Sequence, residues 1–208
     1  MESAWALWTG LGGMLVATAA TSVFWSWKNK QRFNAELDAL QKAMPSHRDG
    51  LVVSALAIDL KPKGHEPTGW FSDLIPLLDE IVARTNLRRV GAFQGTYMVV
   101  GTDERVASSA LRSVAQTALD LRDRVMLYSA IREVPMACGC GIHADIVPTI
   151  GLGSTVALSQ LWSETLALAD RAKDGQIDLS KQSAEWLGTE FDVNMLGERP
   201  VLQARKAA

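Results

Sequence analysis

The chain begins with a long run without charged residues, which extends from Ala4 to Trp27. A helix rises about 1.5 Å per residue, so a run of this length can cross the roughly 30 Å hydrocarbon core of a bilayer. Indole side chains favour the membrane interface, and both ends of the run carry them, at Trp5, Trp8, Trp25 and Trp27. The run therefore predicts a transmembrane anchor at residues 1–27.

Charge on either side of the run predicts its orientation. Only Glu2 and the amino terminus precede it, whereas basic residues follow at once, at Lys28, Lys30 and Arg32. Basic flanks stay in the cytoplasm, so we expect a single-pass protein of an inner or cytoplasmic membrane with its C-terminal domain in the cytoplasm. A cleaved signal peptide is the alternative, because Ala17 and Ala19 resemble a cleavage site. No basic residue precedes the apolar run, however, and the Trp-rich end continues past that site.

Two stretches in this region have spacings that suit dimerisation. Small residues recur every fourth position within the run, at Thr9, Gly13, Ala17 and Thr21, and such a face lets two helices approach closely. Single-span helices also contain small residues for other reasons. Residues 28–49 then read as an amphipathic linker helix that ends at Pro45, with apolar residues at Phe33, Leu37, Leu40 and Met44. This short seam could pack on its twin or on the following domain.

Composition limits the remainder of the chain, residues 50–208, to one domain with its own core. The chain has 208 residues, of which 48% are hydrophobic, and its net charge of −2 gives no field that would attract nucleic acid. The two cysteines, Cys138 and Cys140, fall on the same face of an expected strand. We interpret them as reduced core thiols, and a zinc site is the less favoured alternative.

The apolar pattern from residue 51 onward alternates between strand and helix spacing. Strands are expected at 51–60, on both sides of a turn at 94–96 within 90–100, at 135–142, 147–150 and 175–179, and as a terminal pair within 191–204. Helices are expected at 71–84, 104–126, 158–173 and 182–187, and Pro76 lies inside the first of them. The order β-α-β-β-α-β predicts an α+β, ferredoxin-like core with additions.

Four separated segments, taken in order, carry a resemblance to a known family. They read AIDL at 57–60, YM at 97–98, CGIH at 140–143 and WSETLALADR at 162–171. This ordered set resembles the catalytic domain of the class III adenylyl and guanylyl cyclases over roughly residues 50–204. The resemblance implies a ferredoxin-like fold and an active site that forms between two such domains.

The resemblance also implies which positions would hold metal. In this family the ribose 3′ hydroxyl attacks the α-phosphate of a nucleoside triphosphate, and two Asp residues hold two divalent ions. The first Asp falls on Asp59 and the second on Gly95, which has no ligand atom. Asp59 is therefore a remnant metal ligand by resemblance, and magnesium is expected only if a nucleotide binds. A carboxylate beside Lys61 and Lys63 is alternatively a solvated turn residue.

Four further positions correspond to family residues that contact the ribose and phosphates or that select the base. The family's Asn and Arg, four residues apart on a helix, fall on Ala167 and Arg171, so Arg171 is the remnant nucleotide-binding residue. Alternatively, Arg171 is a cation that suits the end of a helix dipole. The base-selecting positions read Gly91 and Gln160. His143 is interpreted as structural, since it lies at the end of an expected strand.

These replacements predict a cyclase-homology protein that has lost, or nearly lost, its activity. We expect a dimerising scaffold or regulatory subunit, as a homodimer or with another cyclase-like chain, that still has a possible site for a nucleoside triphosphate. One alternative is a divergent active cyclase that recruits Glu164 or Gln94 as a ligand. Another is a purely structural module of a membrane assembly that binds no nucleotide.

Overall fold

The computed structural model describes residues 51–64, 68–103, 109–148, 152–188 and 190–205. The expected anchor and linker lie outside these residues, and so do the dimerisation positions expected there: Gly13, Ala17, Phe33, Leu37 and Leu40. Among the helices in the described part of the chain, none has the length and apolar character needed to span a membrane.

The described part of the chain alternates strands and helices as expected. The strands are β1 (Leu51–Pro62), β2 (Arg88–Phe93), β3 (Thr96–Asp103), β4 (Met136–Val147), β5 (Ile177–Leu179), β6 (Phe191–Leu196) and β7 (Arg199–Arg205). The helices are α2 (Trp70–Val82), α3 (Ser109–Arg132), α4 (Leu152–Arg171) and α5 (Lys181–Leu187).

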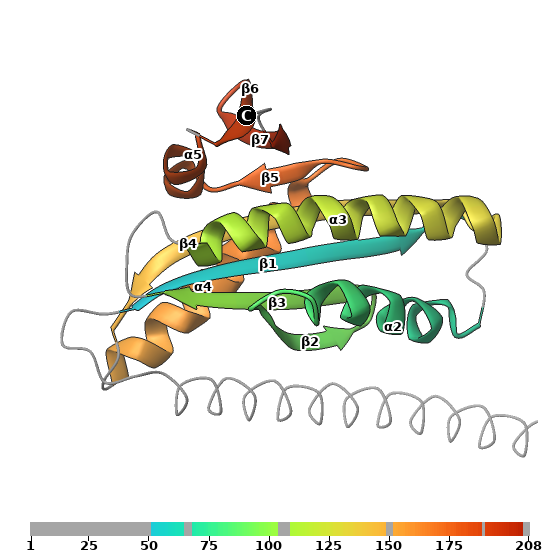
Figure 1. Ribbon diagram of the computed structural model, residues 1–208, viewed down its shortest axis with the longest axis horizontal. Coiled ribbons are helices and arrows are strands. Elements are labelled where there is room, and N and C mark those ends of the chain that lie inside the picture. The colour runs from blue at the N-terminus through green and yellow to red at the C-terminus, as the bar shows by residue number, and fades with distance from the viewer. Residues whose placement is uncertain (1–50, 65–67, 104–108, 149–151, 189, 206–208) are drawn as a thin grey trace, which may run out of the picture. The chain divides into compact units, whose positions relative to one another are not determined.

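The strands form one seven-stranded sheet in the order β2-β3-β1-β4-β5-β7-β6 (Figure 1). Its first four strands are antiparallel and come from a β1-α2-β2-β3-α3-β4 unit, so the predicted ferredoxin-like core is confirmed. Strand β5 then adds parallel to β4, and the β6–β7 hairpin extends the sheet.

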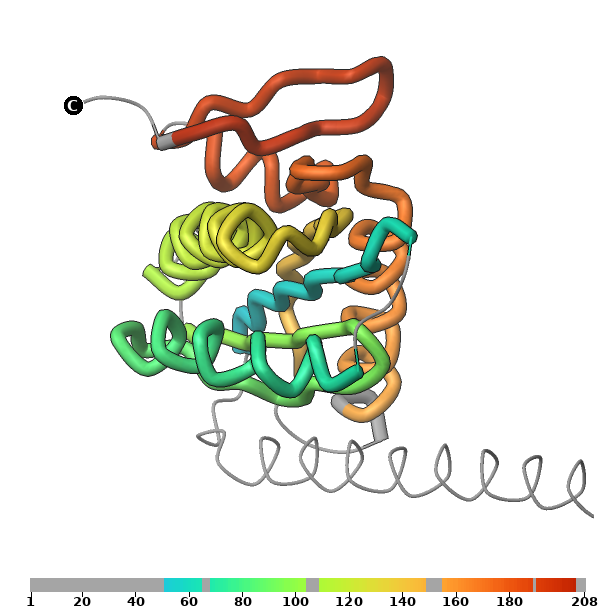
Figure 2. Tube along the Cα trace, turned by 90° about the vertical axis from the view of Figure 1, so that its right-hand side faces the viewer, coloured from blue at the N-terminus to red at the C-terminus, as the bar shows by residue number. Residues whose placement is uncertain are grey.

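Helices cover both faces of the sheet, with α2 and α3 on one face and α4 on the other (Figure 2). Strand alternation explains this arrangement. Cys138, Cys140 and Ile142 of β4 face the core that includes the apolar sides of α2 and α3. The intervening residues, Gly139 and Gly141, face α4.

These two glycines let α4 lie directly on strand β4. A Cβ at Gly139 would come within 2.5 Å of the Ala169 carbonyl oxygen, and a Cβ at Gly141 would collide with the α4 backbone at Ala169 and Thr165. Glycine is therefore the residue that this close approach requires at both positions.

Several boundaries differ from those expected. The strand expected at 147–150 does not start as a separate element, because Val147 is the last residue of β4, which begins at Met136; residues 149–150 lie outside the described part of the chain. Pro76 lies within α2 and neither delays nor ends it, and the helix begins at Trp70. Helix α3 continues to Arg132, and α4 begins at Leu152, so both helices extend beyond the apolar spacing from which they were expected.

Candidate functional site

The first candidate half-site lies at the end of β1, beside the hairpin that joins β2 to β3. Gln94 and Gly95 form a two-residue turn with φ values of 49° and 81°, which is typical of a type I′ hairpin turn. Asp59 pairs with Thr96 in the sheet register, and the Leu60 N–H donates to the Gly95 carbonyl at 2.9 Å. The structure thus brings Asp59 and Gly95 together, as the resemblance implies.

The position of Gly95 has no room for a side chain. A Cβ there would stand 2.5 Å from the carbonyl oxygen of Leu60, and the positive φ is a conformation that side chains rarely adopt. By contrast, a Cβ at Gly91 would make only ordinary contacts, the nearest of them 3.6 Å from Met98 Cε. The two glycines of this hairpin therefore differ in what they tolerate.

Asp59 has a cationic partner from its own strand. The Lys61 ammonium lies 2.6 Å from Asp59 Oδ2 and 3.2 Å from Asp170 Oδ1 at the end of α4. The Asp59 side chain is 19% exposed, whereas Lys61 and Asp170 are largely exposed. Hydrogen bonds to Asp59 and then Asp170 raise the pKa of Lys61. The interpretation of Asp59 as a solvated turn residue is wrong, since β1 continues to Pro62.

A second lysine makes a parallel link. Lys63 pairs with Asp174, which lies just beyond α4, and the other Asp174 oxygen accepts the Cys138 N–H at 3.0 Å. The hydrogen bond from Lys63 is the main cause that lowers the pKa of Asp174. Lys61 and Lys63 therefore both tie the end of β1 to the C-terminal end of α4.

The residues at this half-site do not fit the two-metal arrangement of the family. Magnesium prefers several oxygen ligands in octahedral geometry, and Asp59 already pairs with an ammonium while Gly95 offers no side-chain oxygen. The described residues contain no group of three His, Cys, Asp or Glu side chains that could hold a metal ion. We therefore assign no metal-dependent step to this half-site.

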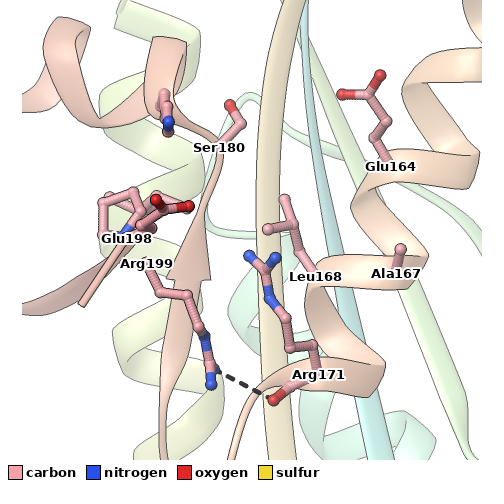
Figure 3. A pocket seen from close by; sticks show the side chains of 10 residues that line it. Glu164, Ala167, Leu168, Arg171, Ser180, Glu198 and Arg199 are labelled. Atoms are coloured by element: carbon pink, nitrogen blue, oxygen red, sulfur yellow. Dashed lines mark hydrogen bonds between the residues drawn. The ribbon is translucent and has the colours of Figure 1, made fainter. Parts of the chain in front are cut away.

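The second half-site is a cavity of about 410 Å³ between α4, the end of β5 and the β6–β7 hairpin. Ala167 and Arg171 both line it, one helical turn apart, as the resemblance implies (Figure 3). Its other lining residues come from three segments: Glu164, Leu168, Leu179, Ser180, Lys181, Glu198, Arg199 and Pro200.

A buried carboxylate fixes two arginines of this cavity. Asp178 of β5 is fully buried, and its Oδ2 accepts from Arg171 Nε at 3.1 Å and from Arg199 Nη2 at 2.6 Å. Arg199 also donates to the Arg171 carbonyl oxygen at 3.2 Å (Figure 3). Sequence reasoning missed Asp178 and Arg199, because partners 21 residues apart on short terminal strands have no local signal.

The two half-sites remain apart within one chain. Asp59 does not line the Arg171 cavity, and Gln160 lies exposed on α4 outside the cavity lining. Gly91 belongs to β2, on the hairpin side. The link between the two half-sites is Asp170, which holds Lys61 and directly precedes Arg171.

His143 connects β4 to the cavity. Its buried imidazole lies on β4, and its Nε2 is 3.1 Å from Glu164 Oε2 on α4. Burial lowers the pKa of His143, while the negative charges of Glu164 and Asp145 act in the opposite direction. Because Glu164 is paired with this histidine, it is a poor candidate for the ligand role of a divergent enzyme.

This lowered pKa predicts an acid-sensitive contribution to stability. The unfolded chain binds a proton at His143 near pH 6.5, above the folded pKa, so stability is highest above about pH 6.5 and declines as pH falls toward the folded pKa. We expect the melting temperature of a His143→Asn variant to fall less steeply between about pH 7 and pH 5 than that of the wild type. The melting temperature of a Glu164→Gln variant should fall more steeply over the same pH range. Equal slopes in all three proteins would contradict the role of His143 in this pH dependence.

The two cysteines lie on the same face of β4, as predicted. Cys138 and Cys140 are free and buried, with their sulfur atoms 3.9 Å apart. Their mutual hydrogen bond, followed by burial, raises the pKa of Cys140. These thiols contribute to the core beneath α2 and α3.

Comparison with known proteins identifies the family. The family model described as the adenylate and guanylate cyclase catalytic domain matches residues 52–207, so the chain belongs to this family. The predicted membership and α+β cyclase fold are therefore confirmed. No match was found among the curated proteins.

Solved structures agree with this fold. The guanylate cyclase domain of RhGC from Catenaria anguillulae, in complex with GTP, has 13% identity and a TM-score of 0.58, over 77% of this chain and 100% of that chain. A non-canonical dimeric guanylyl cyclase domain of the RhoGC fusion protein from Blastocladiella emersonii has 13% identity and a TM-score of 0.54, over 79% of this chain and 100% of that chain. The adenylyl cyclase CyaB from P. aeruginosa has 13% identity and a TM-score of 0.56, over 76% of this chain and 95% of that chain.

Proposed function

We propose that this chain is a membrane-anchored cyclase-homology protein that has lost, or nearly lost, cyclase activity. It acts as a dimerising scaffold or regulatory subunit on the cytoplasmic face of an inner or cytoplasmic membrane. The uncharged run at residues 1–27 and its basic flank support the anchor. The family match over residues 52–207 supports a retained dimer surface, because replacing single catalytic side chains does not remove a surface.

The observation that carries this proposal is the condition of the Asp59 half-site. The carboxylate is paired with Lys61, and the neighbouring family position is Gly95, where a Cβ would meet Leu60. In the other half-site Ala167 replaces the amide-bearing residue of the family. Loss of one preorganised transition-state donor alone costs about 100- to 1000-fold in rate, and the groups of one site act as a unit.

Relatives suggest the kind of partner. One compared structure is a non-canonical dimeric guanylyl cyclase domain and another is a guanylate cyclase domain in complex with GTP. We propose the same general behaviour for this chain: association with a second copy or with another cyclase-like chain, and a possible site for a nucleoside triphosphate at the Arg171 cavity. Magnesium enters only together with such a nucleotide.

An activity assay tests the proposal directly. We expect the purified full-length chain, mixed with ATP or GTP and either Mg²⁺ or Mn²⁺, to form cyclic nucleotide at no more than about one thousandth of the rate of an active family member. An Asp59→Ala variant is the matched control, because it removes the remaining family carboxylate. Turnover in the wild type that disappears in Asp59→Ala would replace the proposal with a divergent cyclase.

A further inference from the structure

One cation lies between two carboxylates from different elements at the end of β1. Asp59 Oδ2 and Asp170 Oδ1 both lie within 3.2 Å of Lys61 Nζ. Asp59 belongs to the central strand, whereas Asp170 belongs to the last turn of α4. Both carboxylates therefore contact the same ammonium group.

The chain itself supplies that cation. Lys61 is two residues after Asp59, so strand alternation places both side chains on the face of the sheet that α4 covers. The neighbouring Lys63 also forms an ion pair near the end of α4, but with the single carboxylate of Asp174. Of the two lysines, Lys61 is the one that contacts Asp59. Asp59 is more buried than Asp170, the other carboxylate that Lys61 contacts.

We propose that Lys61 is the built-in substitute for a bound cation at Asp59, and that removal of its ammonium group opens a weak divalent-ion site between Asp59 and Asp170. The inference rests on the proposed function, since it explains how a carboxylate from a metal-binding family is retained without metal. Hard divalent cations bind carboxylate oxygens, so Mn²⁺ can take the place of the ammonium. Asp170 is the new element of this site, because it comes from α4 and not from the hairpin.

The test measures the thermal stability of the full-length chain after EDTA treatment, with and without about 1 mM Mn²⁺. We expect the wild-type melting temperature to be unaffected by Mn²⁺. Lys61→Ala is expected to lower it by about 2–4 °C, and Mn²⁺ to restore most of that loss. Lys63→Ala is the matched control, because it removes the neighbouring ion pair, and its melting temperature should not respond to Mn²⁺.

Two further variants assign the ligands. Adding Asp59→Asn or Asp170→Asn to Lys61→Ala should abolish the response to Mn²⁺. Lys61→Met retains the aliphatic chain and provides a second background if Lys61→Ala folds poorly. Loss of free Mn²⁺ signal in an electron paramagnetic resonance titration measures binding without relying on stability.

Three outcomes would overturn the inference: Mn²⁺ binding by the wild type equal to that of Lys61→Ala, no binding by Lys61→Ala and Lys61→Met, or the same response from Lys63→Ala. None of these measurements includes a nucleotide. They therefore fail or succeed independently of the cyclase assay, in which turnover by the wild type would overturn the proposed function alone.

Discussion

Replacing Gly95 with Asp is expected to lower the free energy of unfolding by about 2–4 kcal/mol and to leave the chain without cyclase activity. The new Cβ would stand 2.5 Å from the Leu60 carbonyl oxygen, on a backbone with φ of 81°. Either the turn or the end of β1 has to shift, and the Leu60 to Gly95 hydrogen bond weakens with it. Urea denaturation, followed by circular dichroism, measures the loss.

Two variants separate the steric cause from the charge. Gly95→Ala should lose a similar free energy, since it introduces the same Cβ without a carboxylate. Gly91→Ala, in the same hairpin, should change stability by less than about 1 kcal/mol, because its Cβ would meet only ordinary contacts. A Gly95→Asp protein as stable as the wild type and able to cyclise ATP or GTP would show that a single substitution had inactivated this site.

Replacing Asp178 with Asn is expected to destabilise the domain by about 2–4 kcal/mol. The fully buried carboxylate joins Arg171 of α4 and Arg199 of β7, so its loss leaves two neighbouring guanidinium groups without their shared counter-ion. Breaking a buried ion pair costs roughly 3–5 kcal/mol, and the partial exposure of both arginines reduces that figure. Thermal and urea unfolding should agree on the size of the effect.

The control for this prediction is Asp192→Asn. Asp192 lies exposed on β6, in the hairpin that also carries Arg199 into the cavity, so its replacement should have almost no effect. If Asp178→Asn were no more destabilising than Asp192→Asn, the three-residue network would not be what attaches the β6–β7 hairpin to α4. Hydrogen exchange of β7 amides should increase in Asp178→Asn and not in Asp192→Asn.

The order of strands and helices was predictable because it follows from local spacing. Apolar residues at 51–60 and the Gln94-Gly95 turn specify a buried strand and a hairpin, and the fold contains both. The boundaries were less predictable. Strand β4 continues to Val147 because it pairs with β1 along its whole length, and the paired residues lie between 74 and 96 positions apart in the sequence.

The candidate site was predictable only in part, for the same reason. Resemblance identified Asp59 and Gly95 as neighbours and Ala167 and Arg171 as residues of one surface, and the geometry places them so. It gave no indication that Asp170 would reach Lys61 across 109 positions of the chain. Ion pairs of this kind depend on how a helix end meets a strand end, and no residue spacing encodes that.

The glycines of β4 limit how this part of the domain can change in evolution. Since Gly139 and Gly141 leave no side chain between strand and helix, the backbones of α4 and β4 are in direct contact. Any larger residue at either position would have to push α4 off the sheet. Because α4 also carries Arg171 and Asp170, such a displacement would disturb the Asp178 network and the Lys61 ion pair at the same time.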